Sequence, residues 1–134
     1  MLNKIKFLIL IEFEKIRNKI QEIDCIVNPS YHEGMSNVLL EGAAMGKPLI
    51  ASNIPGCKEI IDEGYNGYLF EVKSVESMEE KIIKFIELDD KIKEYMGGNS
   101  RKKVEKEFDR NIVINEYIKA INNILKEGYE YESL

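Results

Sequence analysis

Short apolar runs alternate along the first half of the chain with segments in which apolar residues recur every three or four positions. Short runs are typical of buried strands, whereas the longer spacing is typical of amphipathic helices. The pattern predicts strands at residues 5–11, 25–27, 48–52 and 68–70. It predicts helices at residues 13–23 and 38–45, a C-terminal cap at Gly46 and a short helical turn at residues 59–62.

The chain after residue 74 has the spacing of helices alone. An apolar stripe predicts a helix at residues 75–86, for which Ser74 and Ser77 are rival N-caps. The next helix, around residues 92–96, is expected to break at the glycine pair 97–98, because glycine in a helix interior lowers the stability of the helix.

The last part of the sequence combines a charged segment with a long apolar stripe. Mixed charges at residues 101–107 indicate a solvated helix face. Apolar residues along 114–125 predict a last helix, and residues 128–134 are expected to form a frayed acidic tail.

Strands that alternate with helices predict an α/β fold: a Rossmann-like parallel sheet of about four strands with helices on both faces. A length of 134 residues fits one domain, which we assign to residues 1–127, and no linker or internal repeat suggests another. Such sheets bind ligands at the carboxyl ends of their strands. The loop over residues 28–36 follows one of these ends and is therefore the candidate site.

Composition excludes several classes of function. The net charge of −5 argues against a broad nucleic-acid-binding face. Two distant cysteines and a single histidine offer no disulfide framework, zinc site or His-rich metal cluster. We find neither a membrane-spanning run nor a signal peptide, which predicts a cytoplasmic location.

The candidate loop joins a strand end to a helix start. The strand ends at Asn28, and the helix begins near Ser36 or Asn37, both of which are good N-caps. Gly34 leaves room for a ligand to approach the backbone. Because the first turn of a helix exposes unpaired N–H groups, this loop predicts a phosphate or diphosphate site.

Two carboxylates bracket that site: Glu33 precedes the helix and Glu41 lies on it, with seven residues between them. Carboxylates accept hydrogen bonds from sugar hydroxyls but repel phosphate. The arrangement therefore predicts a phosphate on the helix start and a hydroxyl-bearing ring beside each glutamate, which is the layout of a nucleotide-sugar.

Residues 33–41 resemble the Glu-x7-Glu motif of retaining GT-B glycosyltransferases of the group 1 (family 4) type, in their C-terminal donor-binding domain. The resemblance covers residues 23 to about 127, with matching blocks at residues 23–30, 40–52, 55–61 and 64–70. The residues of these blocks are most similar to those of bacterial capsule and exopolysaccharide transferases. The resemblance implies a metal-independent transferase that needs no cofactor. Its substrate is a UDP-linked hexose or N-acetylhexosamine, and it transfers this sugar with retention to a saccharide or polyprenyl-linked acceptor.

The resemblance also implies roles for single residues. Glu33 is expected to contact the hydroxyls of the donor sugar at the catalytic centre, and Glu41 the ribose hydroxyls. The diphosphate is expected on the backbone amides of four residues, Gly34, Met35, Ser36 and Asn37. Three neighbours are possible pocket residues, namely Ser30, Tyr31 and His32. The family needs no base at this place, so we interpret His32 as a loop residue.

The chain departs from the family in its extent. A full GT-B enzyme has two Rossmann-like domains, and the acceptor-binding domain and a basic pair for the diphosphate have no counterpart here. Arg17, Lys15 and Lys19 are interpreted as a solvated helix face. We therefore expect the isolated chain to be inactive, with its other half missing or supplied by a partner subunit. Because the terminal helices of full GT-B enzymes commonly pack onto the N-terminal domain, part of the apolar stripe at 114–125 is expected to be exposed here and to favour a homo-oligomer. The resemblance places the protein in the cytoplasm or at the inner face of the plasma membrane.

Three alternatives remain open. The chain is either a transferase portion or a non-catalytic remnant that binds a nucleotide or a partner subunit. A UDP-sugar 2-epimerase would need further acid and base residues, and this sequence has one histidine. A flavodoxin-like binding domain would lack the paired glutamates.

Overall fold

A three-stranded parallel sheet forms the centre of the molecule. The computed structural model describes residues 12–131, so the strand predicted at residues 5–11 lies outside the described part. The strand order is β1 (Ile26–Asn28), β2 (Leu49–Ser52) and β3 (Gly67–Phe70), with both pairs parallel. The predicted α/β class and the other three strands are confirmed.

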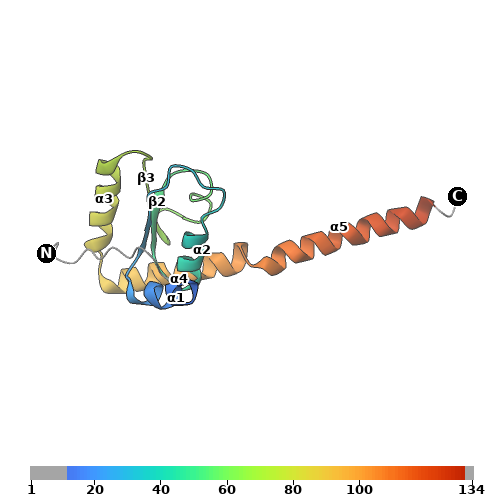
Figure 1. Ribbon diagram of the computed structural model, residues 1–134, viewed down its shortest axis with the longest axis horizontal. Helices are drawn as coiled ribbons and strands as arrows, with labels where there is room; N and C mark the ends of the chain where they lie inside the picture. Colours follow the sequence, from blue (N-terminus) through green and yellow to red (C-terminus); the bar gives the residue numbers. More distant parts are fainter. Residues whose placement is uncertain (1–11, 132–134) are drawn as a thin grey trace.

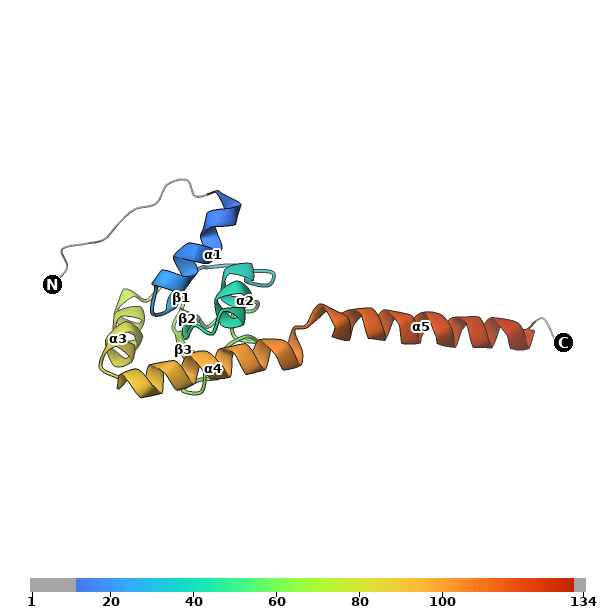
Figure 2. The same ribbon diagram turned by 90° about the horizontal axis from the view of Figure 1, so that it is seen from below.

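Helices flank the sheet on both faces, and one extends away from it. The described helices are α1 (Phe13–Glu22), α2 (Asn37–Ala44), α3 (Val75–Ile86), α4 (Asp90–Glu107) and α5 (Arg110–Tyr131). Figure 1 shows α2 and α3 on opposite sides of the sheet, with α4 across one end. In Figures 1 and 2 alike, α5 projects away from the rest of the molecule.

The alternation of side chains along β2 creates two cores. Leu49 and Ala51 face a cluster that includes residues of α1 and α2, whereas Ile50 faces a cluster that includes residues of β3 and α3. All four residues of β2 are buried, as expected for a parallel strand covered on both faces. The loops that leave the carboxyl ends of the three strands consequently share one edge of the sheet, where the candidate site lies.

The predicted break at Gly97 and Gly98 is wrong, because α4 runs through both residues. A Cβ atom on Gly97 would lie 2.1 Å from the carbonyl oxygen of Gly46, so only glycine lets the two backbones approach this closely. Gly46 itself has a φ of 71°, in keeping with its predicted role after α2. The glycine of α4 is therefore a packing residue rather than a helix breaker.

Other local expectations are refined by the structure. Ser74, not Ser77, caps α3, since its side chain accepts a hydrogen bond from the backbone N–H of Ser77. The helical turn expected at residues 59–62 begins earlier, where the carbonyl of Ile54 accepts from the amides of Cys57 and Lys58.

The charged segment 101–107 is not solvated throughout. Lys103 is 9% exposed and pairs with Asp62 at 2.7 Å, because α4 packs against the loop that precedes β3. Hydrogen bonds from Asn99 and Ser100 to the backbone of that loop strengthen the same contact.

Helix α5 presents the exposed apolar stripe that the sequence predicts. Its large apolar side chains from Ile112 to Leu125 are between 39% and 68% exposed. The helix continues to Tyr131, into the segment expected to fray from residue 128. No helix within residues 12–131 is both long and apolar enough to cross a bilayer.

Candidate functional site

The end of β1 is tied to the start of α2 by the side chain of Asn28. Its amide donates hydrogen bonds to Ser36 Oγ at 2.7 Å and to Glu33 Oε1 at 3.3 Å. Ser30 Oγ lies 2.7 Å from Asn28 Oδ1 and 2.8 Å from Glu33 Oε1, and its single hydroxyl proton is shared between these two acceptors. One carboxylate oxygen of Glu33 is thus held by two donors, and the orientation of the carboxylate is set by the strand end.

The first turn of α2 is left without a side-chain cap. Ser36 occupies the N-cap position, but its side chain makes no capping hydrogen bond. It is 1% exposed and accepts from Asn28 instead. The amides of the first turn after Ser36 therefore keep their hydrogen-bonding capacity and lie at the positive end of the helix dipole.

Open space surrounds this helix start. A Cβ atom built on Gly34 would meet nothing within 4 Å, so the protein leaves the volume beside it empty. Met35 and Asn37 are exposed next to it. The four residues expected at a diphosphate are thus together at the start of α2, with Ser36 buried and the other three accessible.

Gly56 supports this loop from behind, and the sequence gives it no role of its own beyond membership of a family block. Its φ is 86°, and a Cβ atom there would lie 2.6 Å from the carbonyl oxygen of Gly34. Its own carbonyl accepts from the backbone N–H of Ser36 at 3.0 Å. Positive φ and close approach together require glycine at this position.

The two glutamates open onto separate hollows on the surface. Glu33 lines a hollow of about 360 Å³ together with Tyr31, His32 and residues of the loops after β2 and β3. Ser30 is not among its lining residues and acts through its hydrogen bond to Glu33. Tyr31 and His32 therefore lie where a pocket is expected, whereas Ser30 supports Glu33.

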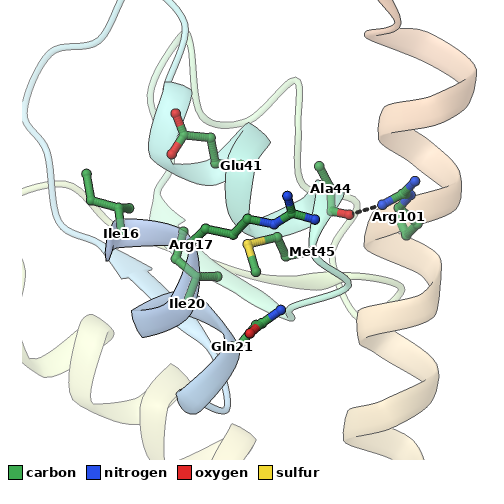
Figure 3. A pocket seen from close by; sticks show the side chains of 8 residues that line it. All are labelled: Ile16, Arg17, Ile20, Gln21, Glu41, Ala44, Met45 and Arg101. Carbon is green, nitrogen blue, oxygen red and sulfur yellow. Dashed lines mark hydrogen bonds between the residues drawn. The ribbon is translucent and has the colours of Figure 1, made fainter. Parts of the chain in front are cut away.

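Glu41 lines a larger hollow, of about 530 Å³, between α1, α2 and α4. Figure 3 shows Arg17 of α1 extending beneath Glu41, and Arg101 of α4 on the far side, where it donates to the carbonyl of Ala44. Arg17 is exposed as expected for a solvated face, but it faces this hollow rather than open solvent. Sequence reasoning missed this, because the spacing within α1 does not reveal that α2 and α4 meet there.

Lys73 is a second residue that sequence reasoning missed. It lines the Glu33 hollow, and its Nζ lies 5.6 Å from the ring centroid of Tyr31. Its φ of 63° is the one positive value among non-glycine residues of the described part. The sequence gives no signal of this conformation, since lysine has no preference for it.

Cys57 lies behind the site, where its buried thiol stays protonated. It is fully buried, and Asn28 Nδ2 lies 3.9 Å from its Sγ. Burial, with the nearby carboxylates of Glu33 and Glu59, raises the pKa of Cys57 to about 11. A thiol with so high a pKa is unreactive near neutral pH, which argues against a nucleophilic role.

Comparison with known proteins places this arrangement in a family. The sequence model of the glycosyl transferases group 1 matches residues 1–103. The chain belongs to the group 1 glycosyl transferases. This group 1 chain therefore contains the paired glutamates and helix start in the family context that the resemblance indicated.

Two curated relatives share about a third of their aligned residues with this group 1 chain. It is 33% identical over 106 residues to the capsular polysaccharide biosynthesis glycosyltransferase CapM of Staphylococcus aureus, covering 79% of this chain and 28% of CapM. It is 32% identical over 107 residues to the N,N'-diacetylbacillosaminyl-diphospho-undecaprenol alpha-1,3-N-acetylgalactosaminyltransferase of Campylobacter jejuni, covering 80% and 28%. The chain thus spans less than a third of the length of these relatives.

A solved structure shows the same fold. Anabaena HepE, determined in complex with UDP, superposes with a TM-score of 0.72 at 21% identity, over 78% of this chain and 29% of HepE. This group 1 chain therefore has the fold of part of a GT-B glycosyltransferase.

Proposed function

We propose that this chain forms the donor-binding wall of a retaining glycosyltransferase. The enzyme transfers a hexosyl or N-acetylhexosaminyl group from a UDP-linked sugar to a saccharide or polyprenyl-linked acceptor. One observation carries the proposal: the uncapped first turn of α2 lies between Glu33 and Glu41, which open onto separate hollows.

Each part of the donor then has a partner with suitable chemistry. The diphosphate binds the amides of Gly34, Met35 and Asn37, where the helix dipole favours negative charge. The amide of Ser36 is not available to it, because it donates to the carbonyl of Gly56. Glu41 accepts hydrogen bonds from the ribose, and Glu33 accepts them from the sugar. Stabilisation of the leaving diphosphate by the helix start is the main contribution of these residues to the reaction.

The choice of UDP and of a lipid-linked acceptor rests on relatives. HepE was determined with UDP, and the name of the Campylobacter jejuni relative gives a diphospho-undecaprenol substrate. Because that class of acceptor is held in a membrane, we place the enzyme in the cytoplasm, working at the inner face of the plasma membrane. Metal independence remains a prediction.

The 134 residues supply one wall of the site, so we expect the isolated chain to bind donor without turnover. The alternative is a non-catalytic remnant that binds a nucleotide or a partner subunit. Titration of the chain with UDP, GDP and ADP and with their sugars, followed by assays with a saccharide acceptor, tests both. Tighter binding of a UDP-sugar than of UDP supports the donor wall, whereas equal binding of a nucleotide and its sugar supports the nucleotide-binding remnant. The absence of binding to all three nucleotides leaves the subunit-interaction remnant.

We also propose that α5 makes a protein contact. Apolar side chains at Ile114, Ile118, Ile121 and Leu125 recur every three or four residues and are exposed. A stripe of this size is a common feature of association surfaces. We assign it to contact with a second copy of the chain, so that the protein is a homo-oligomer in solution.

A further inference from the structure

Tyr31 and Lys73 form a ridge between two hollows at the carboxyl edge of the sheet. Both residues line the hollow of about 360 Å³ that contains Glu33. Both also line a second hollow, of about 260 Å³, which extends towards the start of α3. The pair therefore borders a continuous stretch of surface that begins at a carboxylate and ends at a helix N-terminus.

The backbone of Lys73 holds a conformation that this residue type disfavours. Its φ of 63° costs free energy for any residue with a Cβ atom, and such strain concentrates at functional sites. The salt bridges found among the described residues leave its ammonium group without a carboxylate partner. Lys73 thus presents an uncompensated positive charge between the two hollows.

The second hollow contains a buried polar atom that has no partner. Ser52 is 1% exposed at the end of β2, and its Oγ is the one buried side-chain polar atom of the described residues without a hydrogen bond. Buried polar groups are nearly always satisfied, so an unsatisfied hydroxyl that lines a hollow points to an absent ligand.

The charge around this hollow favours an anion. Its lining residues include Lys73 and Ser74 but no carboxylate. Helix α3 begins there and contributes the positive end of its dipole. The nearest acidic side chain of the first turn, Glu76, accepts a hydrogen bond from Ser74 Oγ at 3.4 Å, but it is exposed and does not line the hollow.

We propose that this surface is a subsite for an acidic sugar. The ring lies against Tyr31 with hydroxyls towards Glu33, and its oxyanion reaches Lys73 and Ser52. The oxyanion is either the carboxylate of a uronic acid or a phosphate ester on the sugar. The inference rests on the proposed function, since it assigns a substrate class to the Glu33 side of the same site.

The three parts of the subsite suit these three parts of the ligand. Aromatic faces pack against the apolar face of a sugar ring, and carboxylates accept from its hydroxyls. A lysine beside a helix N-terminus favours a compact oxyanion over a neutral hydroxymethyl group. A neutral hexose would leave the charge of Lys73 and the hydroxyl of Ser52 unmatched.

Nuclear magnetic resonance titration of the full chain tests the proposal with three sugars: glucose, glucuronate and glucose 6-phosphate. We expect at least one of the two acidic sugars to bind at least ten times more tightly than glucose and to shift the amides of Ser52, Lys73 and Ser74. The tighter of the two identifies the oxyanion.

Three variants sharpen the test. Lys73→Gly removes the charge while glycine keeps the positive φ, so the fold is retained and the preference for the acidic sugar is lost. Ser52→Ala should weaken the acidic sugar several-fold. Lys102→Ala, an exposed lysine of α4 remote from the site, should leave the preference unchanged.

Two results would overturn the subsite: equal binding of glucose and both acidic sugars, or a preference that survives Lys73→Gly. A parallel titration with UDP separates this inference from the proposed function. If the acidic sugar binds through Lys73 while UDP leaves the amides of residues 34–41 unshifted, the donor assignment fails and the subsite stands. If UDP shifts those amides and the sugars show no preference, the subsite alone fails.

Discussion

The side-chain amide of Asn28 donates a 2.7 Å hydrogen bond to Ser36 Oγ. Ser36 occupies the N-cap position of α2, but its side chain is held by Asn28 and accepts no hydrogen bond from the amides of the helix. A polar residue at a strand end thereby leaves the next helix start open for a ligand. The same amide reaches Glu33, so the helix start and one of the paired glutamates are positioned by a single buried side chain.

Replacement of Asn28 by alanine should affect both stability and binding. The change leaves Ser36 Oγ without its buried donor and removes one of the two donors to Glu33, which typically costs about 1–3 kcal/mol. Urea unfolding should show that loss, and the affinity for UDP should fall because Ser36 becomes free to cap α2. Unchanged affinity in a folded Asn28→Ala variant would contradict the role of this bond in the site.

The close approach of α4 to Gly46 predicts opposite effects for neighbouring glycines. Gly97→Ala forces a Cβ atom against a backbone carbonyl and should destabilise the protein by about 1–3 kcal/mol. Gly98→Ala meets nothing within 4 Å and should stabilise the helix by about 0.5–1 kcal/mol. Thermal unfolding of the two variants measures both effects, and equal destabilisation would contradict the packing.

Stability should fall at high pH because of the buried thiols. Burial raises the pKa of Cys57 to about 11 and that of Cys25 to about 12, from a usual value of 9.0. The folded state thus retains thiol protons that the unfolded state releases. The contribution of Cys57 is complete below pH 9 and disappears as pH rises towards 11.

Urea unfolding at intervals from pH 8 to pH 10.5 measures this dependence. Cys57→Ala lowers stability overall but should lose less of it over that interval than the unmodified chain does. Parallel curves for the two proteins would show that Cys57 does not contribute to the pH dependence.

Association through α5 should depend on the apolar stripe and not on charge alone. Ile121→Asp introduces a carboxylate into the stripe and should give a monomer by light scattering at high concentration. Asn122→Asp adds the same charge one position away, outside the stripe, and should leave the oligomer intact. A monomeric unmodified chain would refute the proposed self-association.

The parts of the fold that local spacing controls were predictable, and those that depend on distant backbone were not. The strands around β1, β2 and β3 and the helix after Glu33 follow from apolar spacing and from the motif. The continuity of α4 depends on Gly46, which is about fifty positions away in the sequence, and no local rule reveals that contact.

The site shows the same division. The positions of Glu33 and Glu41 beside one helix start follow from their separation in the sequence. The hollow that joins Glu41 to Arg17 and Arg101 requires three helices to meet. The positive φ of Lys73 arises in the loop between β3 and α3 and has no sequence signal, because lysine has no preference for this conformation.

The central claim is that α2 binds a nucleotide-sugar with one glutamate for each ring. Calorimetric titration of UDP and UDP-glucose into the chain, Glu41→Gln and Glu33→Gln tests it most directly. We predict that Glu41→Gln weakens both ligands by about 1–3 kcal/mol, because a neutral amide replaces the charged acceptor of the ribose hydroxyls, and that Glu33→Gln weakens UDP-glucose alone. Equal affinities of all three proteins for both ligands, or no binding of either ligand to the unmodified chain, would contradict the claim.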